Sequence, residues 1–161
     1  METTCSREKL ESLKVKLSFD NLFNMDKVGR SGGLALYWKS PHNVRLLKFG
    51  RNFIDVRVEN ADSGTWRCTR FYGFPETSKR RDSWELLCSL SSLSSLPWVC
   101  IGDFNDLLHN SEKRGGCQHP NWKLKGFRDA VSDPGLVDLS MEGYQYTWEG
   151  LGARLTGWRR D

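Results

Sequence analysis

The sequence predicts a mixed fold, α/β or α+β, in which β-sheet is covered by a few helices. Three observations predict it. Short segments rich in β-branched and aromatic residues alternate with turns of Gly, Pro, Asn and Ser, which is typical of neighbouring strands. Three other segments carry apolar residues at helical spacing. The chain of 161 residues also contains 8 Phe and 7 Trp, and such bulky side chains favour a β-rich core.

The first half of the chain is predicted to form one short helix and then five strands. Leu10, Leu13 and Leu17 recur at helical spacing, and Ser6 can cap the start of that helix. In the fourth strand Asp55 alternates with apolar neighbours, which predicts a half-buried strand. Short strands with turns between them favour an antiparallel meander. The strands are expected at residues 22–28, 33–38, 44–50, 53–59 and 65–73.

The second half is predicted to contain two helices and three strands. The first helix carries an apolar stripe that we interpret as core packing, formed by Trp84, Leu87, Leu90 and Leu93. The strand that follows it, "WVCIG", is apolar almost throughout and is predicted to be fully buried. The ranges in chain order are 80–93 (helix), 98–102 (strand), 122–131 (helix), 136–139 and 144–148 (strands).

Composition indicates an ordinary soluble domain. Apolar residues make up 38% and charged residues 27%. No segment approaches the roughly 18 apolar residues of a membrane span, and the first residues show no signal-peptide pattern. An odd number of cysteines, 5, without C-x-x-C spacing favours a reducing compartment, nuclear or cytoplasmic rather than secreted. The net charge of +4 would tolerate a polyanionic partner such as DNA.

The stretch "PWVCIGDFNDLL", residues 97–108, is where the chemistry is expected. An apolar strand runs directly into Gly102, Asp103 and Asn105. If the strand alternation continues, both polar side chains face one pocket, Phe104 anchors the turn, and Gly102 permits close backbone approach. A carboxylate beside a carboxamide suits phosphoryl chemistry. The alternative interpretation is an Asx turn that merely ends the strand.

The wider sequence resembles the endonuclease/exonuclease/phosphatase superfamily, which includes deoxyribonuclease I and the apurinic/apyrimidinic endonucleases. Within it, the chain is most similar to the endonuclease domain of plant LINE-type (non-LTR) retrotransposons. The segments that carry the resemblance occur in family order across most of the chain: "SGGLALYW", "FIDVRV", "WRCTRFYGFPE", "RRDSWELL", "PWVCIGDFNDLL", "EKRGG" and "YQYTW".

The resemblance implies a deoxyribonuclease I-like, four-layer sandwich flanked by helices, and a phosphodiester hydrolase that uses Mg²⁺ or Mn²⁺ and acts on DNA. It places Asp103 and Asn105 at the nucleophilic water and the phosphate. Tyr72 would contact the scissile phosphate, and Thr147 would support the site. Glu2 corresponds to the metal-binding Glu of the family, and Mg²⁺ commonly takes only one or two carboxylates.

The resemblance is incomplete at both ends. The family opens with a strand that carries a metal-site Asn and closes with a strand that ends in Ser-Asp-His, and neither segment occurs in this sequence. We therefore expect residues 1–161 to form a single truncated domain. Because general acid–base help is worth about 10²–10⁴-fold, we expect any hydrolysis to be at least about two orders of magnitude slower than in an intact relative. Asp161 is assigned no role.

Two other functions remain open. The chain could be a non-catalytic, nucleic-acid-binding relic of a retrotransposon that holds DNA through basic clusters such as Lys79, Arg80 and Arg81. It could also be a phosphomonoesterase of the same superfamily that acts on a small phosphoester. Mg²⁺-dependent nicking of DNA, salt-sensitive binding without cleavage, and phosphate release from a small ester distinguish the three.

Overall fold

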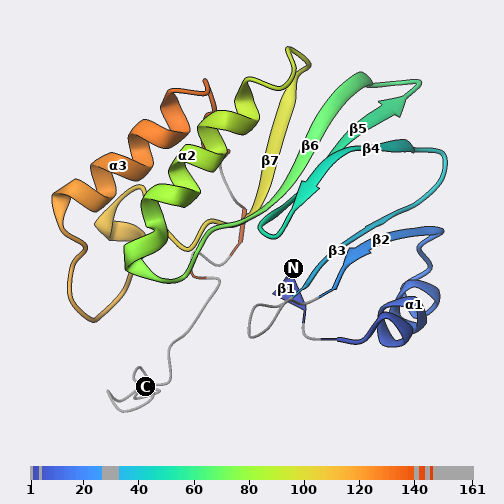
Figure 1. Ribbon diagram of the computed structural model, residues 1–161, viewed down its shortest axis with the longest axis horizontal. Coiled ribbons are helices and arrows are strands. Elements are labelled where there is room, and N and C mark those ends of the chain that lie inside the picture. The colour runs from blue at the N-terminus through green and yellow to red at the C-terminus, as the bar shows by residue number, and fades with distance from the viewer. Residues whose placement is uncertain (1, 4, 27–32, 140–141, 144–145, 147–161) are drawn as a thin grey trace. The chain divides into compact units, whose positions relative to one another are not determined.

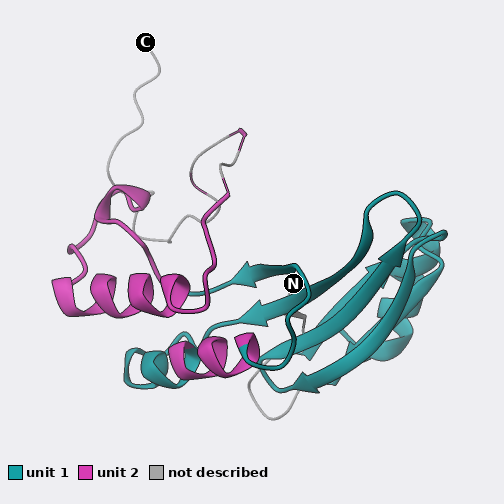
Figure 2. Ribbon diagram, turned by 90° about the horizontal axis from the view of Figure 1, so that it is seen from above, with its two compact units in different colours: residues 1–83, 92–105 teal, residues 84–91, 106–161 magenta. Residues whose placement is uncertain are grey.

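The computed structural model describes residues 2–3, 5–26, 33–139, 142–143 and 146 (Figure 1). Contacts divide the chain into two compact units (Figure 2). One consists of residues 1–83 and 92–105, and the other of residues 84–91 and 106–161. The single domain expected over residues 1–161 stays a prediction.

The first unit begins with a small antiparallel sheet and one helix. Strand β3 (Gly33–Trp38) lies between β1 (Glu2–Thr3) and β2 (Asn21–Met25). Helix α1 (Arg7–Lys16) starts as predicted, with the Ser6 side chain accepting a hydrogen bond from the Lys9 N–H at 3.4 Å. The Tyr37 hydroxyl on β3 donates to the Leu10 carbonyl at 3.2 Å, which ties the helix to this sheet.

A second sheet of four strands completes the first unit. Its order is β4-β5-β6-β7, with β4 at Asn43–Gly50, β5 at Phe53–Asn60, β6 at Gly64–Tyr72 and β7 at Trp98–Asp103. The first three strands form the antiparallel meander that the turns predict. Strand β7 is parallel to β6, because a crossover that includes the 3₁₀ turn Thr77–Lys79 and helix α2 (Arg80–Ser91) returns the chain to the same end of the sheet.

The two sheets pack against each other around an apolar core. Leu34 from β3 is buried together with Ile54, Val56 and Val58 from β5. The rings of Phe23 and Phe49 extend this contact with their centroids 5.5 Å apart. Two packed sheets together with helices confirm the predicted α+β class.

The prediction that β5 is half-buried is wrong, because its charged residue is enclosed. Asp55 is only 1% exposed. Arg67 Nε donates to both of its carboxylate oxygens, at 2.9 and 3.0 Å, and Thr69 Oγ1 donates to Oδ1 at 2.7 Å. Trp98 Nε1 donates to Thr69 Oγ1 at 2.8 Å, and its ring centroid lies 4.8 Å from the Arg67 guanidinium. The charged residue that alternates with apolar residues in β5 therefore belongs to a buried ion pair and does not face solvent.

The prediction that β7 is fully buried is also wrong. Val99 and Ile101 are 41% and 59% exposed. Within the described residues β7 pairs with β6 alone, so it is the last strand of its sheet. Its apolar composition therefore did not distinguish an interior strand from an edge strand.

The second unit contains α2 from Trp84 onward, the 3₁₀ turn Asn110–Glu112, and helix α3 (Asn121–Ser132). Its helices pack closely, since a Cβ placed on Gly126 of α3 would lie 2.3 Å from the Trp84 ring. Leu87 and Leu90 are buried as predicted, whereas Leu93 is exposed because α2 ends at Ser91. No helix in the described ranges has the length and apolarity that a membrane crossing needs.

The end of the described chain departs from the predicted strands. Residues 136–139 adopt no strand, and Val137 and Leu139 point their side chains into solvent. The short "LVDL" run is apolar at three of its four positions, but no neighbouring strand pairs with it among the residues described. The strand predicted at 144–148 lies almost entirely outside the described residues.

The cysteines carry thiols of very different accessibility, and this predicts their reactivity. Burial, with a smaller contribution from Cys68, raises the pKa of the Cys100 thiol to about 12, whereas Cys117 is exposed. Because the thiolate is the reactive form, we expect iodoacetamide at pH 8 to modify Cys117 well before Cys100. Peptide mass spectrometry over time measures both, with guanidinium-unfolded protein as the control. Equal rates for the two thiols in the folded protein would contradict this burial.

Candidate active site

Parallel pairing of β6 with β7 brings two of the predicted site residues side by side. Tyr72 and Asp103 are register partners at the carboxyl ends of these strands. The Gly73 N–H continues the ladder by donating to the Asp103 carbonyl at 2.8 Å. Loops beyond the carboxyl ends of parallel strands are where side chains converge on ligands in sheets of this kind. Tyr72 and Asp103 therefore lie next to each other at the same end of the sheet, where β6 and β7 both finish.

The segment after β7 is a turn, so Asn105 does not continue the strand alternation as expected. Asp103 Oδ1 accepts a hydrogen bond from the Asn105 backbone N–H at 2.8 Å, which is the Asx turn of the alternative interpretation. Asn105 has a φ of 55°, in the left-handed region that Asn tolerates. Its Nδ2 donates to the Gly73 carbonyl at 2.8 Å, which still places the amide at the end of β6.

Two glycines allow the loops to approach this closely. A Cβ on Gly102 would lie 1.8 Å from the Phe71 carbonyl oxygen, and one on Gly73 would lie 2.0 Å from the Phe104 carbonyl oxygen. Phe104 stacks on Phe71 with ring centroids 5.2 Å apart. These contacts confirm that Gly102 permits close approach and that Phe104 anchors the turn.

Asn52 positions Tyr72 and was missed from the sequence. It occupies the tight turn between β4 and β5 and is almost completely buried. Its carbonyl accepts from the Tyr72 N–H at 2.8 Å, and its Nδ2 donates to the Tyr72 carbonyl at 2.7 Å. The sequence offers only an Asn in a hairpin turn, which is common, so the contact to a distant strand could not be inferred.

Arg70 is a second residue missed from the sequence. As a residue two positions before Tyr72 on the same strand, it lies on the same face of the sheet. Its NH1 donates to the carbonyls of Phe71 at 3.2 Å and Ile101 at 3.3 Å. Burial lowers the pKa of Arg70 from its usual value, while the nearby Asp103 carboxylate opposes that change. The site therefore contains an exposed carboxylate and a half-buried guanidinium that interact electrostatically. The signal available in the sequence was this two-residue spacing from Tyr72.

The side chains of the other predicted residues lie outside the described part of the chain. Glu2 lies in β1, where its backbone pairs with Leu34 of β3. Thr147 and Asp161 lie outside the described residues. The structure thus brings together Tyr72, Asp103 and Asn105, and the roles of all five predicted residues stay predictions.

At the strand ends, the described residues offer a hard cation one carboxylate, that of Asp103. The residues with described placement contain no group of three or more His, Cys, Asp or Glu side chains able to hold a metal. Asp103 is exposed, and within the described chain its Oδ2 accepts no hydrogen bond. Mg²⁺ usually keeps several waters and takes one or two carboxylates together with substrate phosphate, so one carboxylate here is compatible with it.

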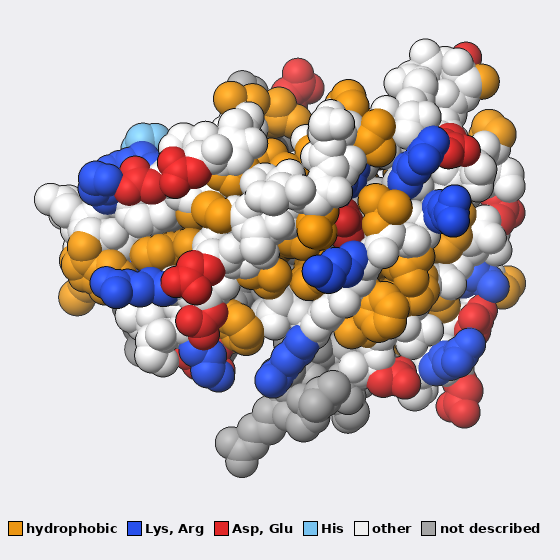
Figure 3. Space-filling view, turned by 45° about the horizontal axis from the view of Figure 1, so that its top comes forward, with side chains coloured by type: hydrophobic (Ala, Val, Ile, Leu, Met, Phe, Trp, Pro, Cys, Tyr) orange, Lys and Arg blue, Asp and Glu red, His pale blue; other side chains and the backbone are white. Residues whose placement is uncertain are grey.

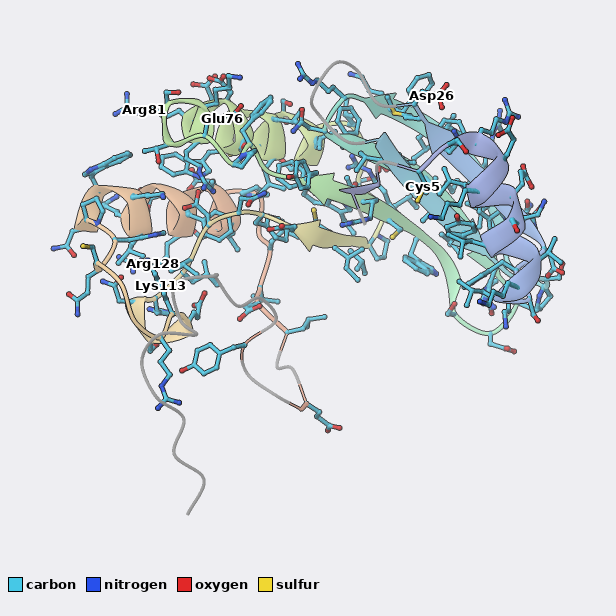
Figure 4. The ribbon with its side chains drawn as sticks, turned by 90° about the horizontal axis from the view of Figure 1, so that it is seen from below. Cys5, Asp26, Glu76, Arg81, Lys113 and Arg128 are labelled. Carbon is cyan, nitrogen blue, oxygen red and sulfur yellow. The ribbon has the colours of Figure 1, made fainter. Side chains whose placement is uncertain are left out.

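The basic cluster Lys79–Arg81 is weaker as a nucleic-acid contact than the sequence indicates. Arg80 is only 7% exposed and donates to the Pro75 carbonyl at 2.9 Å. Lys79 Nζ pairs with Glu76 at 3.3 Å, while Arg81, labelled in Figure 4, is exposed. On the face seen in Figure 3, basic and acidic side chains are likewise interspersed and form no large field of one sign.

The model of the Endonuclease/Exonuclease/phosphatase family matches residues 1–161. The chain belongs to this family. No curated protein matches it. The α+β arrangement with two sheets is consistent with the deoxyribonuclease I-like fold of the endonuclease/exonuclease/phosphatase family, and the membership supports a hydrolase of the phosphodiester class.

Proposed function

We propose that this protein hydrolyses phosphodiester bonds of DNA with Mg²⁺ or Mn²⁺ as its cofactor, as an endonuclease of the kind found in LINE-type retrotransposons. The observation that carries the proposal is the parallel pairing of Tyr72 with Asp103 at adjacent strand ends. Membership of the endonuclease/exonuclease/phosphatase family supports the reaction class. The closeness to LINE endonucleases rests on the series of sequence segments.

Each side chain at the strand ends has a role that its chemistry allows. The Asp103 carboxylate orients the attacking water and takes up its proton, for which Oδ2 is available beside the Asx turn. The Tyr72 hydroxyl donates a hydrogen bond to a phosphate oxygen. Asn105 donates one amide hydrogen to the Gly73 carbonyl, and its second amide hydrogen would donate to the phosphate or the water.

The metal would be held by carboxylates of this chain. Glu2 is the ligand that the family resemblance indicates, and Asp103 is the carboxylate that the structure describes at the strand ends. When bound, the ion supplies neutralisation of phosphate charge and polarisation of the reacting bond. The other contributions to the reaction are orientation of the water, binding of the phosphate and positioning of the loops. They come from the side chains already described.

The test is plasmid nicking with matched substrates. Supercoiled plasmid is incubated with the protein in Mg²⁺ or in EDTA, and relaxed circles are counted on gels. In parallel, phosphate release from p-nitrophenyl phosphate and anisotropy of a labelled duplex are measured. We expect nicking that requires Mg²⁺. Release of phosphate from the small ester without nicking would instead assign a phosphomonoesterase, and salt-sensitive duplex binding without any cleavage would assign a binding protein.

A further inference from the structure

Arg70 is held in a fixed position at the end of the sheet, close to Asp103. Its NH1 bridges the carbonyls of Phe71 on β6 and Ile101 on β7, at 3.2 and 3.3 Å. These two strands are the ones that carry Tyr72 and Asp103. The guanidinium is therefore tied to the same backbone that positions the candidate site.

The glycine before Asp103 is what makes this position possible. A Cβ on residue 102 would lie 2.3 Å from Arg70 NH1 and 1.8 Å from the Phe71 carbonyl oxygen. Any side chain at Gly102 would displace the guanidinium or the strand end. The glycine at this position thus permits both the observed placement of the Arg70 guanidinium and the close approach of β6 to β7.

The tether leaves the substrate-binding edge of the guanidinium available. Arginine has five N–H donors, and both hydrogen bonds that Arg70 makes with described residues use NH1. Nε–H and NH2 therefore remain, and together they form the side-on fork that matches two oxygens of a phosphate. Because the side chain is already ordered and half-buried, little conformational entropy is lost when it binds an anion.

The Arg70 charge also offsets the negative charge at the strand ends. Asp103 is exposed and negatively charged, so alone it would repel the phosphate on which the proposed reaction acts. The Arg70 guanidinium interacts electrostatically with this carboxylate and offsets its charge. A phosphodiester bound next to Asp103 then meets a pair of opposite charges instead of an isolated anion.

We propose that Arg70 binds a phosphate of the nucleic-acid backbone next to Asp103 through its Nε and NH2 donors. The proposal rests on DNA as the proposed substrate. It adds a substrate-binding residue to the site, and it is independent of whether the bond is then cleaved.

Binding of a labelled DNA duplex in EDTA tests the proposal without catalysis. Affinity is measured by fluorescence anisotropy over a range of salt for the wild type, R70Q, R70K and the control R45Q. Arg45 is an exposed arginine on β4, at the opposite edge of the same sheet, so R45Q removes the same charge elsewhere. We expect R70Q to weaken binding at least about tenfold and to lower the salt slope by about one, with R45Q near the wild type.

The variant R70K distinguishes the contribution of the paired Nε–H and NH2 donors from the contribution of the positive charge. It keeps one positive charge but loses the planar donors, so we expect wild-type salt dependence with affinity several-fold weaker. If R70Q does not fold, R70K alone decides the matter. Unchanged affinity of R70K would overturn the proposal, and an altered melting temperature of that variant would then assign Arg70 the role of a structural tether.

The outcomes separate this inference from the proposed hydrolysis. Weaker binding by R70Q than by R45Q, in a protein that nicks no plasmid, supports the phosphate contact and rejects the nuclease. Mg²⁺-dependent nicking with equal affinities for R70Q and R45Q rejects the contact and keeps the nuclease. Absence of duplex binding by the wild type, even at low salt, rejects the contact as well.

Discussion

Replacement of Asp103 by asparagine is expected to lower Mg²⁺-dependent nicking by about 10²–10⁴-fold, the usual value of a general acid–base group. Asparagine retains an Oδ1 that can accept the hydrogen bond from the Asn105 N–H, so the turn is preserved. What is lost is the negative charge and the ability to take a proton from water. Initial nicking rates at saturating Mg²⁺ measure the effect.

The matched control is D62N. Asp62 is an exposed aspartate in the turn between β5 and β6, and the hydrogen bond at that turn uses its backbone N–H, which the substitution keeps. D62N should nick at the wild-type rate. D103A removes the turn acceptor as well as the charge, so a further loss relative to D103N reports the contribution of the Asx turn. A D103N rate equal to that of D62N would rule out a chemical role for this carboxylate.

Replacement of Asp55 by alanine is expected to lower the free energy of unfolding by about 3–5 kcal/mol, because it leaves a buried charge without its partner. Arg67, at 0% exposure, donates to both oxygens of this carboxylate. Thr69 would lose its acceptor at the same time. Urea unfolding followed by circular dichroism and Trp fluorescence measures the change.

E59A provides the comparison on the same strand. Glu59 pairs with Arg57 at 2.8 Å, but both side chains are 40% exposed. Exposed ion pairs contribute about 0–1 kcal/mol, so this variant should unfold close to the wild type. A smaller loss for D55A than for E59A would show that the buried pair does not stabilise the fold.

Local pattern was enough to predict most elements of the first unit. The helix that begins after Ser6 and the strands β2 to β6 follow from spacing, capping and turn residues that act over a few positions. The "GDFN" segment likewise predicted that Asp103 and Asn105 are candidate site residues and that the backbone approaches closely at Gly102. These features are encoded by residues that are neighbours in the chain.

Burial was the property that local pattern predicted least well. The alternation of Asp55 with apolar neighbours predicts that it faces solvent. It is buried instead, because its partners Arg67 and Thr69 come from the next strand. The apolar residues of β7 predict a buried strand, yet Val99 and Ile101 are exposed because β7 is the last strand of the described sheet. In both cases the outcome depends on which strand lies alongside.

The sequence by itself determined the fold class, most of the strands, and the chemical groups of the candidate site. Only the tertiary structure decided that Tyr72 lies beside Asp103, that Asn105 turns back to Gly73, and that Arg70 reaches across to β7. The reason is physical. Secondary structure depends mainly on interactions within a few residues, whereas a site depends on which distant strands pair and in which register.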